Sequence, residues 1–443
     1  MGISGVLVAA LISFLTVQFV TLLWKHRPLP PGPLPLPIIG SLWRVGWKIR
    51  QDTLMKLASS YGNVFTLWIG HTPVVVLAGF EAVYDGLTGN PDALSGKPMF
   101  PSIKVLGKEK GILFSNCKTW KEQRHFGQAA LKKLGQMQKG LVQQIEKEAC
   151  QLVEIFAQEK GQPLDPSLPI MLSVSRVISS IAFGHPVPTD DKALRELTEH
   201  FSTVTKFRGS VGEMIYNVFP SLMQYLPGSH KKVLSSCEFI RSFIKKEIEN
   251  RKKDGATHEP QDYLGFYLAQ MDKEKIDSTT TFEEENLVQV IFDLFVAGTD
   301  TLTATLSWAL HFMVAHPDIQ EKVKKELGSA LSSSKSICYE DRKKLPYTRA
   351  VINEIQRFSN IILFGGPRVC VDALIVLGRF IEKNFFSHPL SSHLKIENTL
   401  VIPDLCSVNL DPKHWETPHQ FNPNHFLDKD GKFMVTVHAW GNS

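Results

Sequence analysis

A long uncharged stretch at the N-terminus limits what this chain can fold into. Ile3–Trp24 contains no Asp, Glu, Lys or Arg, and about 20 apolar residues are enough for a helix to cross a bilayer. Lys25, His26 and Arg27 follow directly, and positive charge after a span keeps that side of the membrane cytoplasmic. A cleaved secretory signal is the alternative, but the apolar run is long and no small-residue cleavage site precedes the prolines. We therefore expect residues 1–24 to form an uncleaved signal anchor.

A proline-rich segment separates this stretch from the rest of the chain. The sequence RPLPPGPLPLPIIG (Arg27–Gly40) cannot form a helix, because its prolines remove backbone donors and hold the chain extended. We expect residues 25–40 to be a stiff linker that sets the distance between the anchor and a domain over residues 41–443. A ligand motif for a signalling domain is the alternative, which we rank lower because a folded pattern begins immediately afterwards.

The composition is typical of a globular protein, and the charge argues against nucleic acid as the main partner. The 443 residues are 43% hydrophobic and 21% charged, and the net charge is only +5. A small excess of positive charge that is spread along the chain argues against nucleic-acid binding. No two of the six cysteines form a CxxC pair, which fits a reducing compartment better than a disulfide framework.

Hydrophobic periodicity predicts a mainly α-helical domain with a small β-sheet region near its start. VFTLWIG and TPVVVLAG predict a hairpin over Val64–Gly79, after which a helical period resumes. Later helices are predicted over Gln136–Gln158, Lys231–Lys253, Glu284–Ala315 and Tyr347–Phe358.

The apolar stretch Phe292–Leu310 carries a polar interruption. Its flanks are apolar on most faces, so we expect a deeply buried helix, yet AGTDT (Ala297–Thr301) places a glycine, two hydroxyls and a carboxylate at its centre. A glycine costs a helix about 1 kcal/mol relative to alanine, and a buried carboxylate needs a partner. The motif indicates either a ligand site beside a widened groove or a kink whose polar side chains bond the preceding turn. The local sequence leaves both open.

Two pairs of residues at helical spacing are chemically suggestive but weak on their own. Trp120 and Arg124, at i and i+4, present an indole donor and a guanidinium from one helix face, which is a suitable clamp for a carboxylate or phosphate. A half-buried tryptophan beside a solvated arginine is the alternative. Glu354 and Arg357, at i and i+3, can form an ion pair, as many surface helices do.

Cys370 is a candidate metal ligand on local grounds. In FGGPRVC (residues 364–370) it follows a glycine turn and stands two residues after Arg368, and a nearby positive charge favours the thiolate form that binds metals. An ordinary strand cysteine is the alternative.

Taken in order, these motifs resemble the cytochrome P450 superfamily of haem-thiolate monooxygenases, and more narrowly the vertebrate microsomal family 2. The resemblance runs from the anchor to about Val435. Its motifs are PPGP, the WxxxR of Trp120 and Arg124, YNVFPSLMQYLPGSHKK, AGTDT, the ExxR of Glu354 and Arg357, and FNPNHF (Phe421–Phe426). It implies a cytochrome P450 fold, haem b as cofactor, and an N-terminal transmembrane helix.

The resemblance also implies roles for single residues. Asp300 and Thr301 would be the catalytic pair, delivering protons to dioxygen on the distal side of the haem, where Ala297, Gly298 and Thr301 would shape the pocket. The residues that would reach the haem propionates are Trp120, Arg124 and Arg368. The structural set beneath the haem would comprise Glu354, Arg357 and His425.

Two departures from the family pattern lead to further expectations. The family's axial cysteine lies in a glycine-rich loop downstream of the FNPNHF turn, whereas Cys370 lies upstream of it, so Cys370 is not expected to bind the iron, and Cys406 is expected to be a buried strand residue. Because VTVHAWGNS follows Met434, we expect the domain to be incomplete at its C-terminus and to lack the metal ligand. We expect an irregular insertion over residues 372–396.

Two functions remain open from the sequence, so whether the chain is an active enzyme is left undecided. The first is a monooxygenase that inserts one oxygen atom of O2 into small lipophilic substrates of xenobiotic, fatty-acid or steroid type. NADPH-cytochrome P450 reductase would supply electrons, with cytochrome b5 as a further candidate donor. The second is a non-catalytic membrane-anchored form that binds lipophilic ligands or a partner. Either would be placed in the endoplasmic reticulum membrane by one span, with its main domain on the cytoplasmic face.

Overall fold

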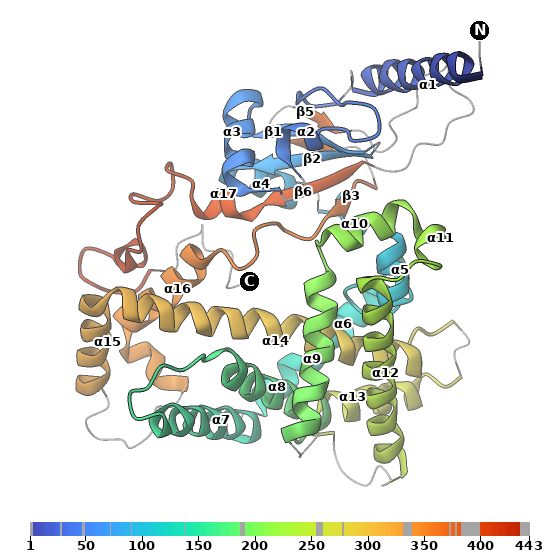
Figure 1. The fold of residues 1–443 in the computed structure, drawn as a ribbon. Helices are drawn as coiled ribbons and strands as arrows, with labels where there is room; N and C mark the ends of the chain where they lie inside the picture. The colour runs from blue at the N-terminus through green and yellow to red at the C-terminus, as the bar shows by residue number, and fades with distance from the viewer. Residues whose placement is uncertain are drawn as a thin grey trace. The chain divides into compact units, whose positions relative to one another are not determined.

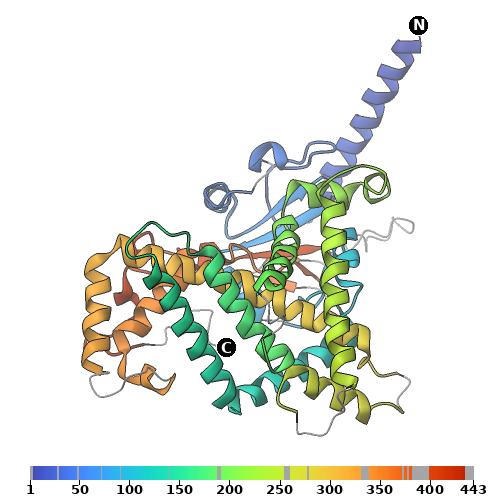
Figure 2. The same cartoon turned by 60° about the horizontal axis from the view of Figure 1, so that its bottom comes forward.

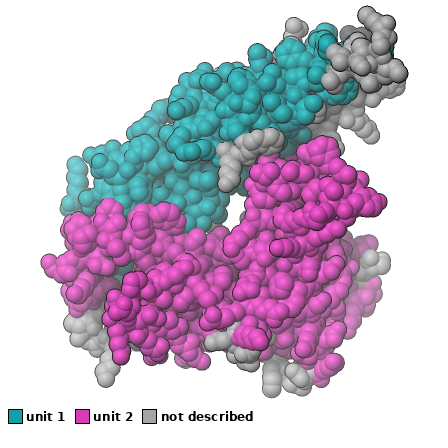
Figure 3. Space-filling view, viewed as in Figure 1, with its two compact units in different colours: residues 1–98, 344–443 teal, residues 99–343 magenta. Residues whose placement is uncertain are grey.

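The chain divides into two compact units, which are described separately. The computed structural model describes residues 3–26, 29–46, 49–70, 72–89, 91–137, 139–186, 191–253, 260–276, 279–330, 339–371, 374–376, 379–381 and 399–434. Unit 1 comprises residues 1–98 and 344–443, and unit 2 comprises residues 99–343 (Figure 3). The predicted class, mainly α with a small sheet, is confirmed.

Unit 1 holds a small sheet with helices beside it (Figure 1). Its elements are α1 (Ile3–His26), α2 (Leu42–Val45), α3 (Gln51–Tyr61), β1 (Val64–Ile69), β2 (Thr72–Ala78), α4 (Phe80–Thr88), α16 (Pro346–Ser359), β3 (Arg368–Val369), β4 (Leu374–Val376), β5 (Arg379–Ile381), β6 (Leu400–Asp404), α17 (Leu405–Asn409) and the 3-10 helix η2 (Pro423–Phe426).

The four-stranded sheet has the order β1-β2-β6-β3. The predicted hairpin is confirmed, because β1 and β2 pair antiparallel from Val64 opposite Leu77 to Ile69 opposite Thr72. β2 pairs parallel with β6, and β6 pairs antiparallel with β3. Alternate residues of a strand point to opposite faces, so β1 and β2 contribute to two apolar clusters. One contains side chains of α3 and the other contains side chains of α4.

The proline-rich segment is bonded to the free edge of this sheet. The backbone N–H of Thr66 in β1 donates to Pro31 O (2.9 Å), and the Thr66 hydroxyl donates to Pro30 O (2.8 Å). A Cβ on Gly32 would lie 1.9 Å from Thr66 O, so only glycine permits this approach. From Pro30 onward the segment therefore covers an edge strand that would otherwise expose unpaired backbone groups.

The predicted insertion is partly ordered. β4 and β5 form an antiparallel hairpin with Leu374 opposite Ile381, and Val376 is fully buried in an apolar cluster of unit 1. The expectation of irregular structure is wrong for these two strands, which pair with each other. The rest of residues 372–396 lies outside the described residues.

Unit 2 is helical (Figure 1 and Figure 2). Its elements are α5 (Pro101–Gly107), α6 (Cys117–Gln136), α7 (Lys139–Gln158), α8 (Ser167–Phe183), α9 (Asp191–Phe207), α10 (Val211–Val218), α11 (Pro220–Met223), α12 (Ser229–Lys253), α13 (Tyr263–Lys273), α14 (Glu284–Ala315), α15 (Pro317–Ala330) and the 3-10 helix η1 (Tyr339–Lys344), which reaches the boundary with unit 1.

The predicted helices are present, with small shifts at their ends. α14 has the predicted bounds, α12 and α16 are each longer than predicted, and the helix predicted from Gln136 begins at Lys139, because Gln136 is the last residue of α6. Pro346 begins α16, a position where the missing N–H of proline costs nothing.

The long helix α14 packs against α8, α9 and α12 in unit 2. Phe292 and Phe295 are buried, but Leu302 and Leu306 are 46% and 43% exposed. The expected deep burial of the whole stretch is therefore wrong for its second half. α14 is long and apolar enough to cross a bilayer, although half of its apolar stretch is buried inside the protein.

Candidate functional site

The predicted site residues are divided between the two units. Unit 1 holds Cys370 and the residues Glu354, Arg357, Arg368 and His425. Unit 2 holds Trp120, Arg124, Ala297, Gly298, Asp300 and Thr301.

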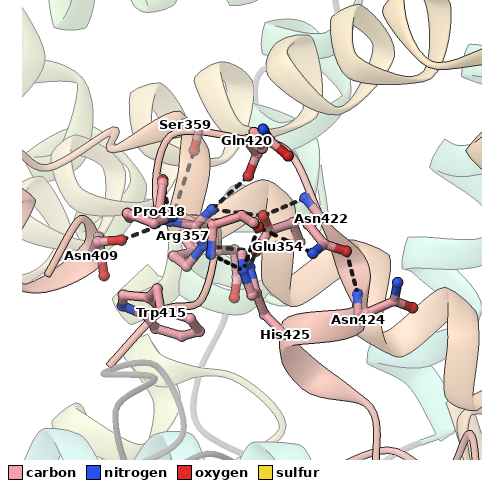
Figure 4. Close-up of polar contacts among 12 residues, drawn as sticks. Glu354, Arg357, Ser359, Asn409, Trp415, Pro418, Gln420, Asn422, Asn424 and His425 are labelled. Atoms are coloured by element: carbon pink, nitrogen blue, oxygen red, sulfur yellow. Dashed lines mark hydrogen bonds and ion pairs between the residues drawn. The ribbon is translucent and has the colours of Figure 1, made fainter. Parts of the chain in front are cut away.

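Arg357 is the centre of a buried polar cluster in unit 1 (Figure 4). One turn of α16 brings it to Glu354, and two N–H groups of its guanidinium donate to the two carboxylate oxygens at 2.7 Å each. The other three N–H groups donate to backbone oxygens of Asn409 (2.7 Å), Pro418 (2.9 Å) and Gln420 (3.0 Å). All five donors of the side chain therefore have acceptors. A residue of α16 is in this way tied to a segment more than 50 positions away.

Glu354 completes the cluster on its acceptor side. Its carboxylate also accepts the backbone N–H of Asn422 (2.7 Å) and contacts His425 Nδ1 (3.3 Å). The backbone N–H of Thr417 donates to His425 Nε2 (3.3 Å). Only a ring nitrogen without a proton can accept this hydrogen bond. The proton therefore belongs on Nδ1, where it is donated to Glu354.

The cluster is shielded from water, which makes its complete pairing necessary. Glu354 is 0% exposed and Arg357 is 4% exposed. The Trp415 ring lies 5.1 Å from the guanidinium carbon, and its indole N–H donates to Val408 O (3.1 Å). A buried ion pair stabilises a fold only when its remaining hydrogen bonds are made, and here they are.

Asp404 supports the cluster indirectly, because it caps the short helix that presents Asn409 to Arg357. Its Oδ1 accepts the backbone N–H of Ser407 (3.1 Å), whereas Oδ2 is buried with no partner among the described residues. Burial raises the pKa of this carboxyl from 3.8 to about 6, against the lowering effect of the backbone N–H groups of Ser407 and Cys406. The folded protein therefore holds this proton more tightly than the unfolded chain does.

We expect Asp404→Asn to stabilise the protein in a pH-dependent way. Because the folded-state pKa is raised, the stability that the protonated Asp404 contributes is fully present below about pH 4 and is lost as pH rises through about 6. Asparagine cannot ionise, and its oxygen can still cap α17. Chemical denaturation should show a gain on the order of 2 kcal/mol at about pH 8 that shrinks towards about pH 5. A difference that is constant over this range would contradict the assignment.

Two cysteines near the motifs of unit 1 are buried. Cys370 follows β3, is 0% exposed, and belongs to an apolar cluster with Val75 and Val401. Cys406 is buried as expected, but it lies on the helix α17 and not on a strand, because Asp404 at the end of β6 starts a helical turn. Burial and the neighbouring Asp404 raise the pKa of Cys406 to about 12, so it stays a thiol. The described residues contain no cluster of three His, Cys, Asp or Glu side chains that could hold a metal ion.

Trp120 and Arg124 form a pair on α6 in unit 2. The guanidinium carbon of Arg124 lies 5.5 Å from the centre of the Trp120 ring, as the i, i+4 spacing predicts. Trp120 is half-buried, and Arg124 is exposed with no ion-pair partner within 4.0 Å among the described residues. The guanidinium can therefore still bind an external anion.

The centre of α14 is an unbroken helix. The Thr301 hydroxyl donates to Ala297 O (2.5 Å), and the next hydroxyls along the helix bond back in the same way. A Cβ on Gly298 would lie 2.5 Å from Ile178 Cδ1, so the glycine permits close approach of α8. Back-bonding and helix packing thus account for Thr301 and Gly298 locally, while Asp300 remains partly exposed.

Asp293 is a buried carboxylate that the sequence interpretation missed. Its Oδ2 accepts the backbone N–H groups of Ile112 (2.7 Å) and Leu113 (2.8 Å), and its Oδ1 accepts Gln289 Nε2 (3.0 Å). The side chain is only 3% exposed. It ties α14 to the loop before α6. A single acid inside the apolar run FDLF was the available signal, because a buried charge requires partners.

Comparison with known proteins agrees with this set of motifs. The sequence model of the family described as Cytochrome P450 matches residues 30–440, which include every predicted site residue. The chain belongs to the cytochrome P450 family. It is 35% identical over 430 residues to Cytochrome P450 2J5 of Mus musculus, covering 96% of this chain and 82% of that protein. It is also 35% identical to Cytochrome P450 2A3 of Rattus norvegicus, covering 97% and 85%. Membership makes it part of a family of haem-thiolate monooxygenases, whose cofactor is haem.

Proposed function

We propose that this cytochrome P450 is a membrane-anchored monooxygenase that inserts one oxygen atom of O2 into small lipophilic compounds of xenobiotic, fatty-acid or steroid type. The family match over residues 30–440 carries the proposal. NADPH-cytochrome P450 reductase is proposed as the electron donor, and cytochrome b5 as a second donor.

The residues of unit 2 fit a haem carboxylate and a proton path. Arg124 lies over the Trp120 ring, is exposed and has no ion-pair partner among the described residues, so we assign its guanidinium to one propionate, and Arg368 on β3 is proposed to reach the other. Haem, when bound, supplies the iron chemistry that activates dioxygen. Asp300, which is partly exposed, and the neighbouring Thr301 are proposed to deliver protons on the distal side of the haem. Ala297 and Gly298 are proposed to shape the substrate side of this helix.

The cluster around Arg357 is proposed to hold the segment from Asn409 to His425 in one conformation. Its hydrogen bonds are all internal, and both charges are buried, so it has no free group with which to bind substrate. Its role is therefore structural, and catalysis is assigned to Asp300 and Thr301.

The membrane anchor is proposed on the length and exposure of α1. Its 24 residues span about 36 Å at 1.5 Å per residue, which exceeds the roughly 30 Å hydrocarbon core of a bilayer. Val17 and Trp24 are 64% and 70% exposed, so these apolar side chains are not covered by the rest of the protein. We propose one span over residues 1–24 in the endoplasmic reticulum membrane, with the domain on the cytoplasmic face.

A haem titration tests the proposal. We expect the full chain in lipid nanodiscs to bind haem, and Arg124→Ala to weaken binding about tenfold, because a charge-assisted hydrogen bond is lost. Lys121→Ala removes the same charge from the same helix without touching the Trp120 pair and should leave haem affinity unchanged. Equal losses in both variants would show that only the general charge of α6 matters.

The alternative is a non-catalytic form that binds lipophilic ligands. The observation behind it is that Cys370 and Cys406 are both buried in the core of unit 1. Turnover of a lipophilic test substrate with reductase and NADPH separates the two functions. In the same samples Cys370→Ser should leave the spectrum of the reduced, carbon-monoxide-bound protein unchanged. A thiolate band that Cys370→Ser abolishes would instead assign the iron ligand to Cys370.

A further inference from the structure

Gln18 carries the only side-chain amide of the apolar helix α1. It lies six residues before Trp24, where the uncharged stretch ends, which is about 9 Å along the helix axis. In the proposed span this depth is inside the hydrocarbon core, which is roughly 30 Å thick. Lysine and arginine can extend their polar ends to the membrane surface, but a glutamine side chain is too short to do so from this depth. The amide is therefore held within the apolar layer.

This amide has no partner among the described residues. Its Oε1 is shielded from solvent and accepts no hydrogen bond. The threonine hydroxyls of the helix differ, because Thr16 donates to Ile12 O and Thr21 donates to Val17 O, each at 2.8 Å. Lipid chains cannot pair with an amide, and an unpaired polar group in hydrocarbon is costly. Gln18 therefore needs a partner from another molecule.

The face of α1 around Gln18 is open. Phe14, one turn before Gln18, is 54% exposed, and Thr21, three residues after it, is also exposed. No other described element of unit 1 packs extensively against α1. A second helix can therefore lie along this face and bring a polar group to the amide.

A second copy of α1 supplies the required group at the required depth. All copies insert in the same orientation, so their Gln18 side chains lie at the same level of the membrane. A primary amide has two donor hydrogens and an acceptor oxygen, so two amides can satisfy each other. We propose that α1 pairs in parallel with α1 of a second copy of this chain through a hydrogen bond between the two Gln18 amides. The pairing rests on the membrane anchor of the proposed function.

Energy transfer between donor-labelled and acceptor-labelled full chains in phosphatidylcholine vesicles tests the pairing. We expect Gln18→Leu to weaken association about tenfold, because the bond between the amides is lost while the apolar span is kept. Gln18→Asn retains an amide and should keep most of the association. Thr16→Val removes a hydroxyl that is already bonded within the helix and should leave association unchanged.

Oxidative cross-linking in the same vesicles tests which face of α1 pairs. Phe14→Cys, four residues before Gln18, places a thiol on the same helix face and should cross-link two copies. Thr16→Cys, two residues before Gln18, places the thiol on another face and should not. The parent chain, with its own six cysteines, gives the background.

Washing the vesicles with alkaline carbonate separates a failed anchor from a failed pairing. If carbonate strips the parent from the vesicles, α1 is not a span, and the anchor and the pairing are both wrong. If the parent resists carbonate but shows no energy transfer, only the pairing is wrong. Unchanged association in Gln18→Leu would place the contact elsewhere in the chain and would also overturn the pairing, as would equal cross-linking of the two cysteine variants.

Discussion

Arg357→Leu is expected to prevent stable folding of unit 1. The change removes five hydrogen-bond donors at once and leaves the fully buried Glu354 carboxylate without its counter-charge. Removing one partner of a buried ion pair costs about 3–5 kcal/mol, and whole domains are stable by only about 5–15 kcal/mol. Urea denaturation and the yield of soluble, monodisperse protein in nanodiscs are the measurements.

Two further variants of α16 separate charge from geometry. Arg357→Lys keeps the charge but cannot reach three backbone oxygens and a carboxylate together, so it should still destabilise by about 2 kcal/mol or more. Gln356→Leu, at an exposed neighbouring position, should change the stability by less than about 0.5 kcal/mol. If Arg357→Lys is as stable as the parent, the carbonyl contacts do not matter and the cluster acts through charge alone.

Asp293→Leu is expected to release the loop before α6 from α14. Three donors lose their acceptor, among them the backbone N–H groups of Ile112 and Leu113, and the expected cost is about 3 kcal/mol. Amide hydrogen exchange should speed up most at these two residues, because the loss is local.

Replacing a buried acid of α14, Asp293, and an exposed one, Glu285, by their amides gives a matched comparison of the free energy of unfolding. Asp293→Asn should cost about 1–2 kcal/mol, because the oxygen of Gln289 accepts Arg241 (3.2 Å) and its amide nitrogen therefore faces residue 293. An asparagine there must direct its own NH2 either at that nitrogen or at the two backbone N–H groups. Glu285→Gln removes an exposed partner of Lys245 and should cost less than about 1 kcal/mol. Equal effects of the two amide variants would show that the buried hydrogen bonds are not what stabilises this region.

Much of the candidate site was predictable where its chemistry is local in the chain. The i, i+3 spacing of Glu354 and Arg357 and the i, i+4 spacing of Trp120 and Arg124 each place two side chains on one helix face, and both pairs are in contact. The β1–β2 hairpin and the bounds of α14 also followed from periodicity, which depends on neighbours in sequence.

The predictions failed where the outcome depends on distant segments. An apolar side chain tends to be buried, but the sequence around it does not say which other segment covers it. Leu302 on α14 is exposed, because no segment covers it within the described part of unit 2. The proline segment was predicted as extended, but its docking on β1 depends on the backbone N–H and the hydroxyl of Thr66, which donate to Pro31 O and Pro30 O. The hairpin of β4 and β5 was missed because two strands of three residues each are too short for a clear period.

The sequence by itself determined the motifs that identify the family, the periodicity of the helices, and the contacts of Trp120 with Arg124 and of Glu354 with Arg357. Each of these depends on side chains only a few positions apart in the chain. Only the tertiary structure decided what those side chains bind. The remaining acceptors of Arg357 are backbone oxygens 52 to 63 positions away. Every residue carries such an oxygen, so no sequence pattern marks the three that are used. The partners of Asp293 could not be predicted for the same reason. They are the backbone N–H groups of Ile112 and Leu113, which come within reach only when α14 packs against the loop before α6.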